Sequence, residues 1–225
     1  MSDIKKGCLY VVATPIGNMR DITLRALDVL KEVDFIICEE YRSGSTLLKR
    51  LGIEPKEIVE LNEHNEAEQT PEIVQRLYLD QSAALISDCG TPVFADPGAT
   101  LIHRLVEDGI PVVPLPGPSS LMAALSILDF KIERFLFAGF LPRDRSERRK
   151  ALKALRPLRI PIILMDAPYR LSPLLDDLDA VFGGDAVITL AMDLTLHNES
   201  IFRGTLSAAR KQIGRRKSEF ILILH

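Results

Sequence analysis

The fold is decided by the first strand-and-helix unit, Cys8-Leu9-Tyr10-Val11-Val12-Ala13, which continues through a turn at 14–20 into the helical pattern of Ile22–Val33. The opening run is short and apolar, as is typical of a strand buried on both faces of a parallel sheet. In the segment after the turn, apolar residues recur at helical spacing, and Asp21 is the expected N-cap. The stretch therefore predicts a βα unit.

The same alternation continues through the first half of the chain. Four more apolar runs are predicted strands: Phe35–Cys38, Glu57–Leu61, Ala83–Ser87 and Pro111–Leu115. Thr70-Pro71-Glu72 has the capping residue and the proline that begin a helix, and Gly98–Asp108 is a second helix that ends before Gly109. Five β/α repeats predict an α/β domain built on a parallel five-stranded sheet.

Proline then marks a domain boundary. Pro114-Leu115-Pro116-Gly117-Pro118 holds three prolines in five residues, which indicates an ordered connection rather than a helix or strand. We therefore expect an N-terminal α/β domain at 1–116 and a C-terminal α/β domain at 117–225. The elements expected in the second are, in order, helix Leu121–Leu128, strand Phe135–Phe140, helix Arg145–Leu155, strand Ile160–Met165, helix Leu171–Val181, strand Ala186–Ala191 and strand Phe220–Leu224.

Composition excludes several classes of protein. The 225 residues carry a formal net charge of −3 and are 47% hydrophobic, which suits neither a basic nucleic-acid coat nor a disordered acidic tail. The three cysteines have no C-x-x-C spacing, so we expect no disulfide framework and no metal site. No apolar run approaches the roughly 18–20 residues that span a bilayer, so we expect a cytoplasmic protein without a membrane partner.

Charge is nevertheless uneven. Glu54–Asp80 holds eight acidic and two basic residues, whereas Arg143–Arg159 holds eight basic and two acidic ones. Such a basic stretch could contact phosphates, or it could be a solvated helix face, and the pattern does not choose.

The loops that follow the predicted strands are the expected ligand sites, because open α/β sheets bind ligands at the carboxyl ends of their strands. The first loop, Thr14–Asn18, lacks the glycine patterns of dinucleotide and phosphate loops. The fourth, Ser87–Gly98, packs two glycines, two prolines and two aspartates into twelve residues. These residues allow close approach to a ligand and give Asp88 as an acceptor, although both aspartates could instead cap backbone amides. Ser119 and Ser120 could likewise present amides to an anion or serve only as a helix cap.

Five motifs in order along the chain carry a resemblance to a known family. They are Leu9-Tyr10-Val11-Val12-Ala13-Thr14-Pro15-Ile16-Gly17-Asn18 with Asp21-Ile22-Thr23, Ser87-Asp88-Cys89-Gly90-Thr91-Pro92, Asp96-Pro97-Gly98, Pro114-Leu115-Pro116-Gly117-Pro118 and Gly139-Phe140-Leu141-Pro142. Together they closely resemble the tetrapyrrole methylase family. Within it they are most similar to the branch that methylates the 2′-hydroxyl of a cytidine in small-subunit ribosomal RNA.

The resemblance implies two α/β domains, the second with a mixed sheet, and S-adenosylmethionine (SAM) in the cleft between them, usually in a homodimer. It also implies a cofactor pocket, carried over by position. Its residues are Ile16, Gly17, Asp88, Gly90, Pro92, Val93, Ser119, Ser120, Ala123, Met165 and Ala191. Small residues and backbone groups of this kind suit a methionine carboxylate and an adenine.

Methyl transfer to a ribose hydroxyl requires a base and an aligned acceptor. Glu40, after the second predicted strand, and His64, after the third, are the catalytic candidates. Arg42 and Asn65 beside them, together with Arg143 and Arg145 in the basic stretch, are the expected substrate-binding residues. The expected partner is small-subunit ribosomal RNA or the assembled small subunit.

Two motifs of the second domain depart from the RNA-methylating branch. Met192-Asp193-Leu194-Thr195-Leu196 stands where that branch usually has Arg-Glu-Leu-Thr-Lys, so both cations are missing. Met165-Asp166-Ala167-Pro168-Tyr169-Arg170 keeps the arginine of a Tyr-Glu-Ser-x-x-Arg pattern but not its Tyr-Glu pair. Two alternatives therefore stand beside RNA methylation: SAM-dependent methylation of a tetrapyrrole or another small molecule, and a SAM- or RNA-binding module without turnover.

Overall fold

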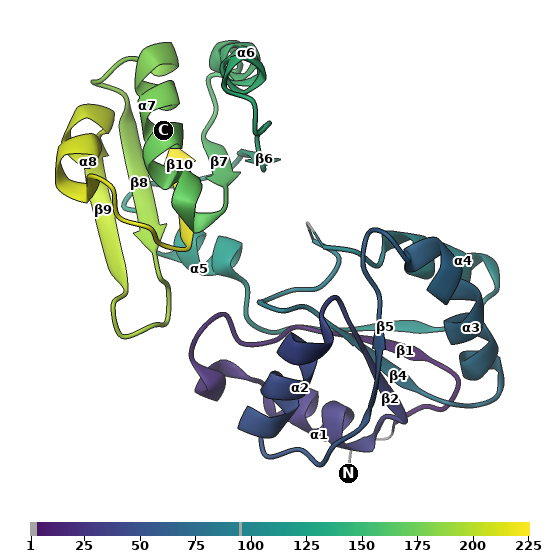
Figure 1. Cartoon of the computed structure of the whole chain (residues 1–225). Coiled ribbons are helices and arrows are strands. Elements are labelled where there is room, and N and C mark those ends of the chain that lie inside the picture. Colours follow the sequence, from purple (N-terminus) through teal and green to yellow (C-terminus); the bar gives the residue numbers. More distant parts are fainter. Residues whose placement is uncertain (1–3, 95) are drawn as a thin grey trace. The chain divides into compact units, whose positions relative to one another are not determined.

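The computed structural model describes residues 4–94 and 96–225, and the chain divides into two compact units on either side of the Ser119–Ser120 bond. Each unit contains one five-stranded sheet with helices packed on both of its faces (Figure 1). The fold is therefore two α/β domains, the first with a parallel and the second with a mixed sheet, as predicted.

The first unit is built on a wholly parallel sheet. Its strands are β1 (Leu9–Val12), β2 (Phe35–Cys38), β3 (Glu57–Glu60), β4 (Ala83–Ile86) and β5 (Val112–Leu115), in the order β3-β2-β4-β1-β5. Val12 at the end of β1 is in register with Ile86 of β4 and Leu115 of β5. The loops that follow these three strands therefore leave the sheet at the same edge.

The helices of the first unit cover its sheet in two pairs. They are α1 (Leu24–Glu32), α2 (Tyr41–Arg50), α3 (Glu66–Tyr78) and α4 (Ala99–Glu107). Leu30 of α1 and Leu48 of α2 share one core cluster with β1 residues such as Val12. Ile73 of α3 and Leu101 of α4 belong to the cluster on the other face.

Two predicted helix starts in this unit are wrong. Asp21 ends a short 3-10 helix, Met19–Asp21, and Thr23 is the N-cap of α1 because its hydroxyl accepts a hydrogen bond from the Ala26 amide. The helix expected from Thr70 begins at Glu66, so Pro71 lies inside α3. Proline has no amide hydrogen to donate, but the Thr70 hydroxyl donates to the Glu66 carbonyl at 2.7 Å in that first part of the helix.

The second unit has a mixed sheet. Its strands are β6 (Leu136–Gly139), β7 (Ile162–Met165), β8 (Val187–Met192), β9 (Ser200–Thr205) and β10 (Phe220–Leu224), in the order β6-β7-β10-β8-β9. Only β6 and β7 pair in parallel, whereas β10 is antiparallel to both β7 and β8. Strands β6, β7 and β8 consequently run in the same direction and end at the same edge of the sheet.

Four α-helices complete this unit, with two short 3-10 helices at Arg156–Leu158 and Pro168–Arg170. The α-helices are α5 (Ser120–Ser126), α6 (Arg145–Leu155), α7 (Leu171–Phe182) and α8 (Leu206–Ile213). The last three pack on one face of the sheet, and Ala124 of α5 belongs to the core on the other. No helix in the described part of the chain is long and apolar enough to span a bilayer.

Candidate functional site

Direct hydrogen bonds tie together the loops that follow β1, β4 and β5. The buried Thr14, after β1, donates its amide to the Gly90 carbonyl at 2.8 Å and its hydroxyl to the Ser87 carbonyl at 3.0 Å. Thr91 then donates its hydroxyl to the Pro118 carbonyl at 3.3 Å. The three loops thus form one connected edge of the first unit.

Two residues in the loop after β4, Gly90 and Val93, have positive φ angles. Gly90 has φ +90°, and a Cβ there would lie 3.3 Å from Cγ2 of Ile16 in the loop after β1. Val93 has φ +70°, which is a strained conformation for a β-branched residue and is found mainly at functional sites. The structure therefore brings together Ile16 and Gly90, two of the expected cofactor residues, and places Val93 in the same strained loop.

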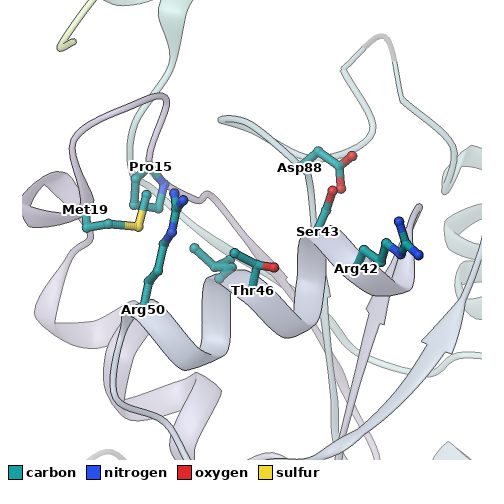
Figure 2. A pocket seen from close by; sticks show the side chains of 8 residues that line it. Pro15, Met19, Arg42, Ser43, Thr46, Arg50 and Asp88 are labelled. Carbon is teal, nitrogen blue, oxygen red and sulfur yellow. The ribbon is translucent and has the colours of Figure 1, made fainter. Parts of the chain in front are cut away.

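Carboxylates gather around this loop. Burial raises the pKa of Asp88, and the negative charges of Glu40 and Asp96 raise it further, while a hydrogen bond from Ser43 opposes the shift. Burial also raises the pKa of Glu39, reinforced by Asp96 and Asp88. Figure 2 shows the Asp88 carboxylate above the Ser43 hydroxyl, in the first turn of α2. The site consequently favours a ligand that brings positive charge.

Glu66 has a structural role in this site that the sequence did not indicate. Its Oε1 accepts hydrogen bonds from the amides of Gly98, Thr100 and Leu101, at 3.0, 2.8 and 3.2 Å. These amides open α4, whose own N-cap Gly98 offers no side chain. Glu66 thereby holds the far end of the loop that contains Asp88 and Gly90. Its three partners lie 32 to 35 residues away along the chain, so no local pattern signals the contact.

The catalytic candidates lie on exposed turns. Glu40 is the N-cap residue of α2, and its Oε2 accepts a hydrogen bond from the Ser43 hydroxyl at 3.3 Å. The side chain of His64 is 86% exposed, and its Nε2 lies 3.5 Å from Oε1 of Glu63. Both side chains remain open to a substrate, and their catalytic roles stay predictions.

The two predicted substrate-binding residues of the first unit, Asn65 and Arg42, differ in how far their side chains are exposed and held by hydrogen bonds. Asn65 is held in its turn, because its side-chain oxygen accepts from the Asn62 amide and its nitrogen donates to the Glu60 carbonyl. Arg42 is exposed on α2 and lines a pocket of about 300 Å³. Arg42 is therefore the better placed of the two to meet a ligand.

The cofactor residues expected from the second unit lie on α5, β7 and β8. Ser120 is the first residue of α5, and the Ala123 carbonyl accepts a hydrogen bond from the Ser126 hydroxyl. Met165 ends β7 and is partly buried, whereas Ala191 of β8 is fully buried in the core. Ala191 can therefore meet a ligand only if the residues that cover it move, and its cofactor role stays a prediction.

Much of the basic stretch is paired rather than free. Arg145, Arg148 and Arg149 all contact the fully buried Asp177 of α7, at 3.0, 2.6 and 2.6 Å. Arg148 is itself buried and donates to the carbonyls of Pro142 and Arg143. Arg145 remains 64% exposed. Arg145 and the exposed Arg143 can thus reach a phosphate, but Arg148 has a structural role.

Comparison with known proteins settles the family. The sequence model described as Tetrapyrrole (Corrin/Porphyrin) Methylases matches residues 8–210. The chain belongs to the tetrapyrrole methylase family. It is accordingly a methyltransferase that uses SAM as its methyl donor.

The similar curated proteins cover nearly the whole chain. A protein of Escherichia coli O157:H7 named Ribosomal RNA small subunit methyltransferase I is 40% identical over 99% of this chain and 79% of its own length. One of the same name from Pseudomonas aeruginosa is 43% identical over 87% of this chain and 69% of its own length.

Solved structures agree on the fold. Uroporphyrin-III-C-methyltransferase from Thermus thermophilus superposes with a TM-score of 0.65 at 19% identity, over 97% of this chain and 94% of its own. Cobalt precorrin-4 methyltransferase, a cobalamin biosynthetic enzyme, gives a TM-score of 0.68 at 18% identity, over 99% of this chain and 98% of its own.

Proposed function

We propose that this methyltransferase transfers the methyl group of SAM to the 2′-hydroxyl of a cytidine in small-subunit ribosomal RNA. The observation that carries the proposal is the 40% identity, over 99% of the chain, to a protein named Ribosomal RNA small subunit methyltransferase I. The cytidine and its 2′-hydroxyl come from the motif resemblance described above.

The residues of the first unit fit the cofactor. When bound, SAM would supply a methyl group activated by a positively charged sulfonium, with a neutral thioether as the leaving group. Asp88 and its neighbouring carboxylates provide the negative surroundings that a sulfonium favours. Gly90 keeps the loop surface free of a side chain, and Ile16 beside it offers an apolar contact for an adenine. We therefore assign Ile16, Gly17, Asp88, Gly90, Pro92, Val93 and Ser119 to the cofactor. For Ser120, Ala123, Met165 and Ala191 the cofactor role rests on the family resemblance alone.

The remaining steps belong to the chain's own side chains. A ribose hydroxyl is a weak acid, so the enzyme must align it and accept its proton. Glu40 can orient the hydroxyl or take that proton, and His64 is the second candidate for the same task. Arg42, Arg143 and Arg145 can hold phosphates of the strand.

The partner in this proposal is small-subunit ribosomal RNA, free or in the assembled subunit, and the enzyme therefore works in the cytoplasm. We further propose a homodimer, as the family resemblance implies. Light scattering of the purified protein gives the molar mass directly, and a mass of one chain at working concentrations would contradict the dimer.

A tetrapyrrole acceptor is the second candidate. The observation that favours it is the pairing of the second unit's cations. Arg148 is committed to Asp177, Arg210 to Asp176 and Asp179, and Arg216 to Asp193. These arginines are consequently less available to the phosphates of RNA.

Methyl transfer distinguishes the two acceptors. The protein is incubated with methyl-labelled SAM and, separately, with undermethylated small subunits, naked small-subunit RNA and a tetrapyrrole panel. We expect the label in 2′-O-methylcytidine when nucleosides are separated by mass spectrometry. Label only in a tetrapyrrole would establish the second candidate, and SAM binding without transfer to any acceptor would show a binding module.

A further inference from the structure

A pocket of about 300 Å³ lies in the first unit, at the carboxyl edge of its sheet. Helix α2 forms one wall with Arg42, Ser43, Thr46 and Arg50, and Pro15 and Met19 from the loop after β1 form the other (Figure 2). Its volume is at the lower end of the range for small-molecule sites. The pocket is thus large enough for a compact ligand such as one nucleotide.

The helix presents its polar residues to the pocket in a regular row. Arg42, Thr46 and Arg50 are spaced by four, which places them on one face of α2. Figure 2 shows Thr46 between the two arginines, with Arg50 extending toward Pro15 and Met19. The spacing corresponds to about 12 Å along the helix axis, so the row is longer than a single phosphate.

Arg42 and Arg50 differ from Arg76 and Arg104 of the same unit, each of which is paired with a carboxylate. Arg76 is paired with Glu57 at 2.6 Å, and Arg104 with Asp108 at 2.6 Å. Within residues 4–94 and 96–225, neither Arg42 nor Arg50 makes an ion pair. Their guanidiniums are therefore available to an anionic ligand, and guanidinium groups match phosphate oxygens well.

Asp88 also lines this pocket, and its negative charge makes the two ends of the pocket electrostatically different. Its carboxylate repels a phosphate, so the phosphate belongs at the Arg50 end. Pro15 and Met19 supply an apolar surface for a base, and the Thr46 hydroxyl can bond to a sugar or phosphate oxygen. A pocket that offers contacts for a phosphate, a base and a sugar fits a nucleotide better than it fits a free anion.

We propose that this pocket binds a phosphate-bearing nucleotide of single-stranded RNA, with Arg50 and Thr46 as contacts that the sequence motifs did not indicate. The inference rests on the proposed function, because it takes the RNA to be the methyl acceptor. A nucleotide held here lies beside Asp88 and Ser43, at the same sheet edge as the proposed cofactor loops.

The test measures binding of a fluorescein-labelled oligocytidylate by fluorescence anisotropy over a series of salt concentrations. The variants are Arg50→Gln and Thr46→Val. The matched control is Lys49→Gln, which removes one charge from the neighbouring exposed position of α2 without touching the pocket.

We expect Arg50→Gln to weaken binding roughly tenfold, as loss of a charge-assisted hydrogen bond does. Its plot of log affinity against log salt should become shallower by about 0.7, the contribution of one phosphate contact on a single strand. Thr46→Val should weaken binding without changing that slope. Lys49→Gln should bind like the wild type, and calorimetry should give all variants the wild-type affinity for SAM.

Any one of three results would overturn the proposal that this pocket binds RNA. They are no binding of oligocytidylate by the wild type, an unchanged slope of log affinity against log salt in Arg50→Gln, or an equal loss of affinity in Lys49→Gln. Wild-type methyl transfer to small subunits is measured in parallel and tests the proposed function separately. Transfer with an unchanged Arg50→Gln slope would reject only the pocket. An Arg50-dependent slope without transfer would reject only the proposed function.

Discussion

The carboxylates around the loop after β4 in the first unit lie close to one another, whereas the buried Asp177 of the second unit is surrounded by arginines. Around the loop after β4, burial and mutual repulsion raise the pKa values of Asp88 and Glu39. In the second unit, burial opposes the ionisation of Asp177. Hydrogen bonds from Arg149, Arg145 and Arg148 outweigh that effect and lower its pKa.

This difference distinguishes a candidate ligand site in the first unit from a structural ion-pair network in the second. Like charges held close together destabilise a folded protein and persist where a ligand uses them. A buried carboxylate that is matched by guanidiniums instead holds helices together, here α6 against α7. The basic stretch therefore supplies part of the packing between α6 and α7, whereas the cluster of like charges around Asp88 lies beside the proposed cofactor loops.

The largest expected effect is on Asp177. Asp177→Ala leaves Arg148 buried without its carboxylate, and breaking such a pair costs about 3 kcal/mol or more in free energy of unfolding. Because the chain has no tryptophan, the measurement is chemical denaturation followed by circular dichroism. Hydrogen exchange then locates the loss, which we expect in α6 and α7.

The matched control is Asp176→Ala. The Asp176 side chain is 44% exposed and pairs with Arg210, so its loss should cost less than about 1 kcal/mol. Equal costs for the two variants would contradict the scaffold role of Asp177.

Glu66 gives an intermediate effect. Glu66→Ala removes the acceptor for three amides at the start of α4 and should cost about 1 to 2 kcal/mol, as loss of a helix cap does. We also expect weaker SAM binding, because the same contact holds the loop that contains Asp88. Calorimetry and denaturation test the two effects, with the exposed Glu68→Ala as the control on the same helix. A stability loss without any change in SAM affinity would separate α4 from the cofactor site.

The smallest effect is the pH dependence of stability, which should have opposite signs in the two regions. The raised pKa of Asp88 gives a contribution that is present below its unfolded value of about 3.9 and is lost as pH rises through the folded value. The lowered pKa of Asp177 gives a contribution that is present above the unfolded value and is lost as pH falls through the folded one.

The free energies of unfolding of the wild type, Asp88→Asn and Asp177→Asn, measured across the acidic range, test these signs. The wild type should lose stability relative to Asp88→Asn as pH rises, and gain it relative to Asp177→Asn. If the free energies of unfolding of the two variants, relative to the wild type, changed with pH in the same direction, the difference between the two regions would be contradicted.

Sequence predicted the elements with strong apolar patterns and missed those without them. Phe35–Cys38, Arg145–Leu155 and Phe220–Leu224 form as predicted, because apolar spacing is a direct signal of burial. Helix α2 was missed, since Tyr41–Arg50 contains Gly44 and two serines, which are weak helix formers. Its Gly44 is required by packing, because a Cβ there would lie 2.6 Å from Sγ of Cys38.

Strand β9 and helix α8 were also missed. For the candidate site, motifs located the loop at Ser87–Gly98, but not the contacts that hold it. The bonds from Glu66 to α4 and from Asp177 to α6 join residues about thirty positions apart, so only the folded chain reveals them.

The central claim is that the loops of the first unit hold the cofactor through Asp88 and Gly90. Calorimetric titration of SAM into the wild type, Asp88→Ala, Gly90→Leu and the exposed control Asp28→Ala tests it most directly. We expect binding to be lost in the first two variants, with circular dichroism unchanged, and retained in Asp28→Ala. Wild-type affinity for SAM in both Asp88→Ala and Gly90→Leu would contradict the assignment.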